Sequence, residues 1–101
     1  MPDDMQRALA ALSGLVAGNE VTAGMSIRAR GQDLILARTE EAGSGEPVPV
    51  DRVKLTRLGP NTWGLSVKRH TGRWQKTPFS GDMQAVVDAI WTFMQHLVAP
   101  Y

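Results

Sequence analysis

The hydrophobic side chains change their spacing twice along the chain, and this constrains the fold more than any other feature. Near both ends they recur every three or four residues, which is typical of amphipathic helices. Between the ends they alternate with polar residues, which is typical of half-buried strands. The spacing predicts helices over about 4–17 and about 83–98, with strands between them.

The signals at the helix ends agree with this division. Asp3 or Asp4 can cap the start of the first helix, and Gly18 followed by Asn19 can end it. The second helix follows the sequence Ser-Gly-Asp at 80–82, which offers two further caps.

The middle of the chain predicts about five short strands joined by turns. A two-residue turn at Gly31-Gln32 would place Ala29 opposite Leu34, so that apolar side chains stay on one face. Further turns are expected at 59–61 and 70–72, and Pro78 is expected to end the last strand because it cannot donate to a ladder. The predicted strands lie near 23–30, 34–36, 52–56, 63–67 and 73–77.

The segment 40–49 interrupts the alternation. It is acidic and rich in glycine and proline, so we expect a flexible loop that links two parts of one sheet. The whole chain, 1–101, is then a single α+β domain. Its expected architecture is a two-layer sandwich, in which an antiparallel meander is covered on one face by the terminal helices.

The composition places the chain in a broad class. It is 43% hydrophobic and 21% charged, which is ordinary for a soluble globular domain. It has no cysteine, which excludes disulfides and thiolate metal sites and favours a reducing, cytoplasmic location. Its apolar stretches are too short to cross a bilayer, so we expect no membrane contact.

The charges are strongly polarised although the net charge is only +1. The segment 51–76 carries seven cations and one carboxylate, whereas the remainder of the chain is net acidic. If the turn at 59–61 joins two of these strands, the uncovered face of the sheet becomes basic and polar. The candidate binding residues are Arg52, Lys54, Lys68, Arg69 and Arg73.

The position of Trp74 depends on the length of the turn before it. A two-residue turn at 71–72 places the indole beside Trp63 in the core, which we prefer because burying an indole is favourable. A three-residue turn at 70–72 places it among the cations, where it could stack on an unpaired base.

These features predict a non-enzymatic, self-associating protein-interaction module, a homodimer joined through Trp91 and Phe93, whose basic sheet face holds an acidic protein partner. The alternative function is nucleic-acid binding through the strands of 51–76. Cations on an open antiparallel face also serve solubility and protect sheet edges, so the pattern alone does not require a ligand.

The apolar stripe of the second helix is wider than one surface helix needs to reach a core. Either Trp91 or Phe93 would then be left over. The stripe fits a helix that lies deep across a curved sheet, and it also fits a homodimer contact, which aromatic residues favour.

No pattern in the sequence indicates catalysis, a metal site or a cofactor. The two histidines, His70 and His96, have no neighbours that resemble a catalytic triad or a metal cluster, so we do not expect an enzyme.

The order helix, five strands, helix resembles the layout of frataxin-like domains, in which two helices pack on one face of an antiparallel sheet. Those proteins carry a carboxylate-rich first helix for iron. Here the first helix offers only Asp3 and Asp4, so the resemblance implies a fold and no iron site. The layout is also similar to that of small secretion-chaperone domains, which dimerise and bind partners.

Overall fold

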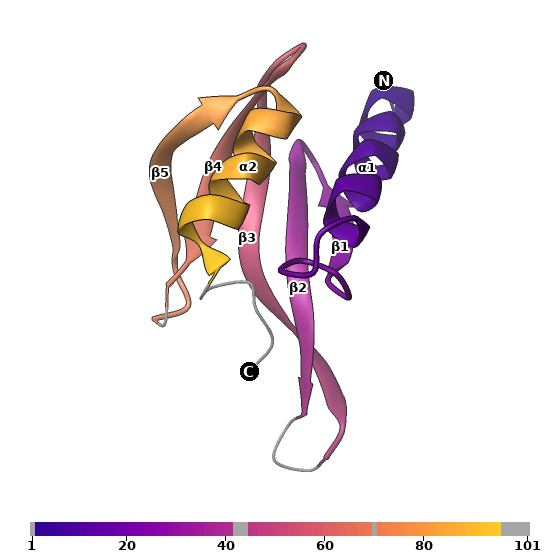
Figure 1. Cartoon of the computed structure of the whole chain (residues 1–101), viewed down its shortest axis with the longest axis vertical. Coiled ribbons are helices and arrows are strands. Elements are labelled where there is room, and N and C mark those ends of the chain that lie inside the picture. The colour runs from indigo at the N-terminus through magenta and orange to yellow at the C-terminus, as the bar shows by residue number, and fades with distance from the viewer. Residues whose placement is uncertain (1, 42–44, 70, 96–101) are drawn as a thin grey trace.

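The computed structural model describes residues 2–41, 45–69 and 71–95, and the side chains of 2–4, 40 and 41 are not described. Two helices bracket five strands along the chain (Figure 1). The elements are α1 (Pro2–Ala17), β1 (Ser26–Arg30), β2 (Asp33–Glu41), β3 (Pro47–Gly59), β4 (Thr62–Lys68), β5 (Trp74–Gly81) and α2 (Met83–Phe93).

The five strands form one antiparallel meander in the order β1-β2-β3-β4-β5, and both helices lie on the same face of it (Figure 1). Helix α1 packs on β1, α2 packs on β4 and β5, and the two helices touch each other. The predicted α+β two-layer fold is therefore confirmed. Neither described helix is long and apolar enough to cross a membrane.

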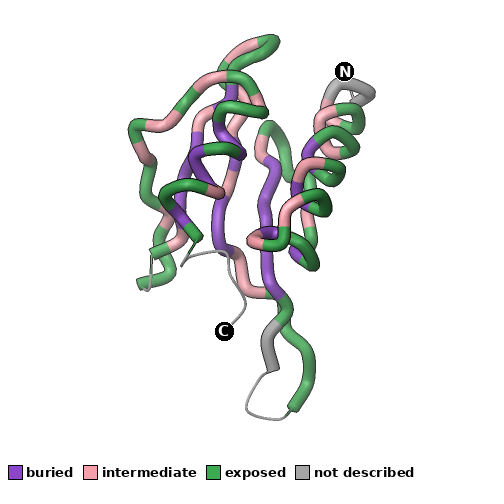
Figure 2. The backbone as a smooth tube through the Cα atoms, in the orientation of Figure 1, coloured by how far each residue is buried: buried purple, intermediate pink, exposed green. Residues whose placement is uncertain are grey.

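The core lies between the sheet and the helices, where the buried parts of the central strands meet (Figure 2). Alternate strand residues point into it, and the helices add their apolar stripes. The fully buried large side chains include Leu12, Leu34, Leu36, Val53, Leu55, Leu65, Val86 and Ile90.

The first hairpin has the predicted register. Ala29 pairs with Leu34 and Ile27 pairs with Leu36, so the connection at 31–32 has two residues. Gly31 has a φ of +61°, a conformation that glycine adopts without the steric cost of a Cβ atom. The alternation of apolar residues and the turn chemistry point to the same register, which explains why both ends of the hairpin were predictable.

The helix ends agree partly with the sequence. Helix α1 begins at Pro2, earlier than predicted, and ends at Ala17, after which the Gly18 amide donates to the Gly14 carbonyl. Asp82 caps α2, because its carboxylate accepts a hydrogen bond of 2.8 Å from the Ala85 amide. Helix α2 ends at Phe93, and the predicted continuation over 96–98 lies outside the described residues.

The prediction that 40–49 is a loop without regular structure is wrong for 40–41 and 47–49, while 42–44 lie outside the described residues. Strand β2 continues to Glu41 and β3 begins at Pro47, with Glu41 paired to Pro47. Together they form a long ribbon that extends beyond the other strands (Figure 1). Because the backbone pairs regardless of side-chain hydropathy, a polar composition did not exclude strand structure here.

The prediction that Pro78 ends the last strand is also wrong. Strand β5 continues past it to Gly81, and the register against β4 shifts between Gly64 and Ser66. An edge strand with an irregular register tolerates proline, because its missing N–H removes no required ladder bond.

A second irregularity lies between β2 and β3. Leu36 pairs with Val53, but the next residue, Ala37, pairs with Asp51, so Arg52 is the extra residue of a bulge. Just beyond it, Arg38 is buried, and its guanidinium donates to the Val21 and Ala23 carbonyls at 2.7 Å each. These bonds attach the segment that follows α1 to the sheet.

Candidate functional site

The sheet face that points away from the helices, called the open face below, is defined by strand pairing. Lys54 pairs with Ser66, and Ser66 pairs with Lys76. Residues directly opposite in antiparallel strands share a face, so these three point the same way. The neighbouring Leu55 and Leu65 point into the core on the other side.

Trp74 lies on the open face, which contradicts the preferred prediction that it packs beside Trp63. Trp74 pairs with Lys68, and Lys68 stands two residues after Ser66 on β4. The Arg69 amide donates to the Arg73 carbonyl, which leaves the three-residue connection 70–72. Gly72, with a φ of +86°, supplies the left-handed conformation that such a connection needs.

Two lysines contact the Trp74 ring. The Nζ of Lys54 lies 4.6 Å from the ring centroid and the Nζ of Lys68 lies 4.9 Å from it. Both distances fall within the range of cation–π attraction, which contributes about 0.5–1 kcal/mol per pair at exposed sites. The structure thus joins an aromatic plane to two positive charges from β3 and β4.

Beneath these long side chains, the open face has a buried floor. Ile35, Ala37 and Ser66 expose only 4%, 1% and 6% of their surface, although no helix covers them. Ile35 and Ala37 also lie outside the main core cluster. At Ile35, the side chains of Trp74, Arg30 and Lys54 line the same hollow, so long side chains lie beside this part of the floor in place of a helix.

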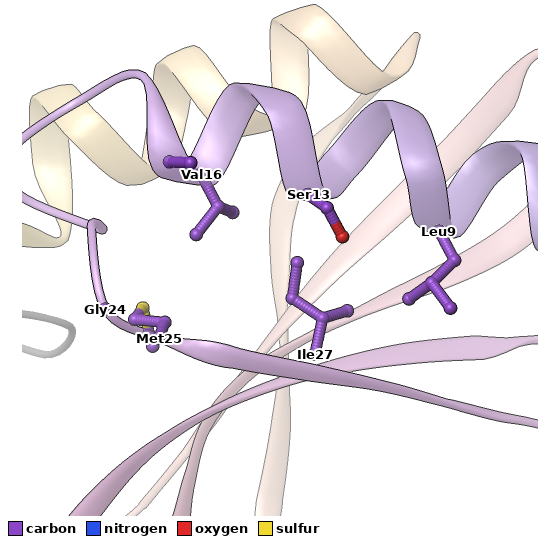
Figure 3. Close-up of a pocket in the computed structure, with 7 residues that line it drawn as sticks. Leu9, Ser13, Val16, Gly24, Met25 and Ile27 are labelled. Carbon is purple, nitrogen blue, oxygen red and sulfur yellow. The ribbon is translucent and has the colours of Figure 1, made fainter.

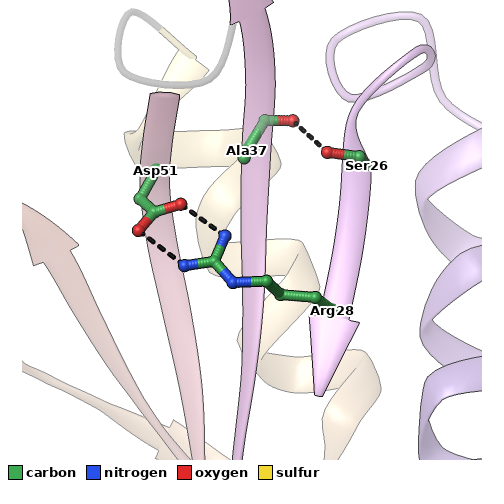
Figure 4. A network of polar contacts seen from close by, with 4 residues as sticks. All are labelled: Ser26, Arg28, Ala37 and Asp51. Atoms are coloured by element: carbon green, nitrogen blue, oxygen red, sulfur yellow. Dashed lines mark hydrogen bonds and ion pairs between the residues drawn. The ribbon is translucent and has the colours of Figure 1, made fainter. Parts of the chain in front are cut away.

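One ion pair crosses the open face from β1 to β3. The Arg28 guanidinium donates to both carboxylate oxygens of Asp51, at 2.6 and 2.9 Å, beside a hydrogen bond from the Ser26 hydroxyl to the Ala37 carbonyl (Figure 4). The hydrogen bonds from Arg28 lower the pKa of the Asp51 carboxyl, and partial burial opposes this shift. The positive charges of Arg28, Lys68 and Arg30 lower the pKa further. The same pair raises the pKa of Arg28.

The structure brings only two of the five predicted cations together. Lys54 and Lys68 meet at Trp74, whereas Arg52 is only 6% exposed, at the bulge. Burial of Arg38 lowers the pKa of its guanidinium, and the positive charge of Arg52 lowers it further.

Arg69 and Arg73 lie on the other side of the sheet. The Arg69 amide donates to the Arg73 carbonyl directly beside the pair of Lys68 and Trp74, so by alternation along the backbone their side chains fall on the face opposite that of Trp74. Arg69 accordingly donates to Gln75 at 2.6 Å, and Gln75 pairs with the core residue Val67.

Three further cations lie on the open face and were missing from the predicted set. Arg28 and Arg30 come from β1, where they alternate with Ile27 and Ala29, and Lys76 comes from β5. Arg28 and Arg30 lie outside the basic segment 51–76, although the alternation of the first predicted strand places them on this face, whereas Lys76 lies inside that segment. With Lys54 and Lys68, these residues make five cations on the open face, where the carboxylates of Asp33 and Asp51 also lie.

The open face contains a shallow hollow of about 430 Å³ between Trp74 and the hairpin of β1 and β2. Charged, apolar and aromatic groups converge on it. Its lining residues are Arg30, Gly31, Gln32, Asp33, Ile35, Lys54 and Trp74.

A second concavity, of about 170 Å³, lies between α1 and β1 (Figure 3). Leu9, Ser13 and Val16 of α1 point toward Ile27 across it. None of its lining residues is charged, so it lacks the groups that would orient an ionic ligand.

The two aromatic residues predicted for self-association have different environments. Trp91 is half-buried, and its indole N–H donates to the Thr22 hydroxyl at 3.1 Å. Phe93 is 61% exposed and stacks on Phe79 of β5, with ring centroids 5.3 Å apart. Phe93 is therefore the aromatic residue that α2 leaves outside the core.

Within the described part of the chain, no three histidine, aspartate or glutamate side chains gather as metal ligands would. His70 and His96 lie outside the described residues. Comparisons with protein-family models, curated proteins and solved structures found no match. The chemistry of the open face therefore carries the functional conclusion.

Proposed function

We propose that this protein binds single-stranded nucleic acid on the open face. The observation that carries the proposal is the Trp74 ring, which lies on that face with the ammonium groups of Lys54 and Lys68 within 5 Å of its centroid. Proteins that bind single strands combine these two elements, an aromatic plane for a base and cations for the phosphates.

The aromatic residue favours a nucleic acid over an acidic protein as the ligand. An acidic peptide would use the lysines and arginines of the face but has no base to stack on the indole. A duplex keeps its bases paired, so it too would leave the indole without a partner. An acidic protein partner remains the outcome if the face binds polyanions without any contribution from Trp74.

The width of the open face suits a short single-stranded nucleic acid. Neighbouring strands of a sheet lie about 4.8 Å apart, so the distance from β1 to β5 is roughly 19 Å. Arg30 and Lys76 stand at its two edges, with Lys54 and Lys68 between them. The proposal assigns binding to this face and requires no catalytic group.

A titration of labelled single-stranded and duplex DNA tests the proposal, with anisotropy as the readout. If the bound strand makes four phosphate contacts, raising the salt concentration from about 50 to about 200 mM should weaken its binding about 50-fold. The duplex should bind more weakly than the single strand. No binding of either at low salt would refute the proposal.

Tryptophan fluorescence in two variants separates stacking from charge attraction. Trp74→Phe should abolish the quenching that accompanies binding, whereas Trp91→Phe should retain it, since Trp91 lies on the helix side. Equal quenching in both variants would show that the strand does not contact Trp74.

A second candidate function, self-association, rests on the exposed Phe93 stacked on Phe79. Aromatic residues are enriched where proteins meet, and Phe93 is exposed although Phe79, on which it stacks, packs against the core. If it forms a homodimer contact, Phe93→Ser should convert a dimer to a monomer in light scattering without loss of folding. A parent protein that is monomeric at high concentration would refute this function.

A further inference from the structure

The hollow beside Trp74 has the composition of a site for one planar base. Ile35 forms an apolar floor and Trp74 an aromatic wall, while Arg30, Asp33 and Lys54 supply charged groups around them. Its volume, about 430 Å³, lies within the range of small-ligand sites. A base that stacks on the indole could therefore place one of its edges near the β1–β2 hairpin.

The carboxylate of that hairpin is held in position by a neighbouring strand. Arg30 and Asp33 face each other across the two-residue connection, and both line the hollow. The Thr56 hydroxyl donates to Asp33 Oδ1 at 2.7 Å, which holds the carboxylate in place from the neighbouring strand. A side chain held in this way loses little further entropy when it binds a ligand.

An ionised carboxylate only accepts hydrogen bonds, whereas a guanidinium only donates them. Guanine is the base that matches both, because it presents two adjacent donors, N1–H and N2–H, next to two acceptors, O6 and N7. Thymine and uracil present a single donor between two carbonyl oxygens, so their oxygens would face the carboxylate. Adenine and cytosine each offer one donor beside an acceptor and match Asp33 only in part.

We propose that the hollow is a guanine-selective subsite, in which Trp74 stacks on the base, Asp33 accepts from its N1–H and N2–H groups and Arg30 donates to its acceptor edge. This assignment rests on the proposed binding of single strands and adds a base preference to it. Lys54, which contacts the indole and also lines the hollow, would serve the adjoining phosphate.

Competing oligonucleotides that differ by one base test the subsite. We expect a thymidine heptamer with one central guanosine to bind about tenfold more tightly than the all-thymidine heptamer, which is the scale of one bidentate base contact. Central adenosine and cytidine should give intermediate affinities. Equal affinity for all four strands would overturn the subsite and leave the proposed function standing, whereas no binding of any strand would overturn both.

Asp33→Asn identifies the residue responsible, and Asp51→Asn is its matched control. Both variants remove one negative charge from the open face, but Asp51 pairs with Arg28 and does not line the hollow. Both should raise the affinity for the thymidine heptamer to a similar extent. Only Asp33→Asn should reduce the guanosine preference to about twofold or less, and an unchanged preference in that variant would overturn the assignment.

Thermal unfolding of each variant shows whether the hairpin is intact. If Asp33→Asn unfolds the hairpin, Thr56→Val supplies the second test, because it removes the bond that holds the carboxylate and keeps the charge. It should lower the guanosine preference and leave the affinity for the thymidine heptamer unchanged. A guanosine preference in Thr56→Val equal to that of the parent would overturn the role assigned to Asp33.

Discussion

The two faces of the sheet bury their residues by different means. The helix face is covered by α1 and α2, whereas the open face buries Ile35, Ala37 and Ser66 without a helix above them, and Trp74, Arg30 and Lys54 lie beside Ile35. A cover made of long polar side chains can move aside for a ligand, but a packed helix cannot do so without unfolding. This difference is the reason why we assign the proposed binding to the face that no helix covers.

The largest expected difference comes from the same substitution on each face. Trp63→Ala removes a core side chain and should lower the free energy of unfolding by about 3–5 kcal/mol. Trp74→Ala removes two cation–π contacts and part of a movable cover, so we expect a loss of only about 1–2 kcal/mol. Urea denaturation of both variants measures the two losses, and equal losses would break the distinction between the faces.

A smaller effect is expected from the polar contacts on the helix side. Thr22 is fully buried, donates to the Val16 carbonyl at 2.8 Å and accepts from the Trp91 indole. Thr22→Val preserves the shape but leaves these groups without their partner, which should cost about 1–3 kcal/mol. Thr56→Val, which breaks a hydroxyl bond on the open face, is the matched control and should cost less in the same denaturation experiment.

The smallest effect concerns the ion pair of the open face. The pKa of Asp51 is lowered in the folded protein from its ordinary value of 3.8, so the pair stabilises the fold above pH 3.8. This contribution, at most about 1 kcal/mol for a pair near the surface, is lost as the pH falls through the lowered pKa. Between neutral pH and pH 2, the free energy of unfolding should therefore depend less on pH in Asp51→Asn than in the parent. Identical pH profiles would show that the ion pair does not stabilise the fold.

Much of the fold followed from the sequence because several local signals agreed. The alternation around Ala29 and Leu34 and the glycine turn between them led to one register, and the structure has it. The extension of β2 and β3 through the acidic segment was not predictable in the same way. Backbone pairing does not require apolar side chains, and the acidic, glycine- and proline-rich composition of this segment indicated a loop.

The site was less predictable because it depends on register. One residue more in the connection at 70–72 moves Trp74 from the core to the open face, and the indole itself fits either place. The bulge that buries Arg52 likewise lies between two strands of ordinary alternation. Hydrophobicity alone favoured a core position for Trp74, but the lysines beside it provide an alternative cover for the ring.

The most direct test of the central claim reverses the same number of charges on each side of the sheet. Lys54→Glu with Lys68→Glu changes the open face, and Arg69→Glu with Arg73→Glu changes the opposite side next to it. Single-strand affinity should be lost in the first double variant and largely retained in the second, measured by anisotropy at low salt. Equal losses in both would show that binding follows net charge alone, and would contradict the assignment of function to the open face.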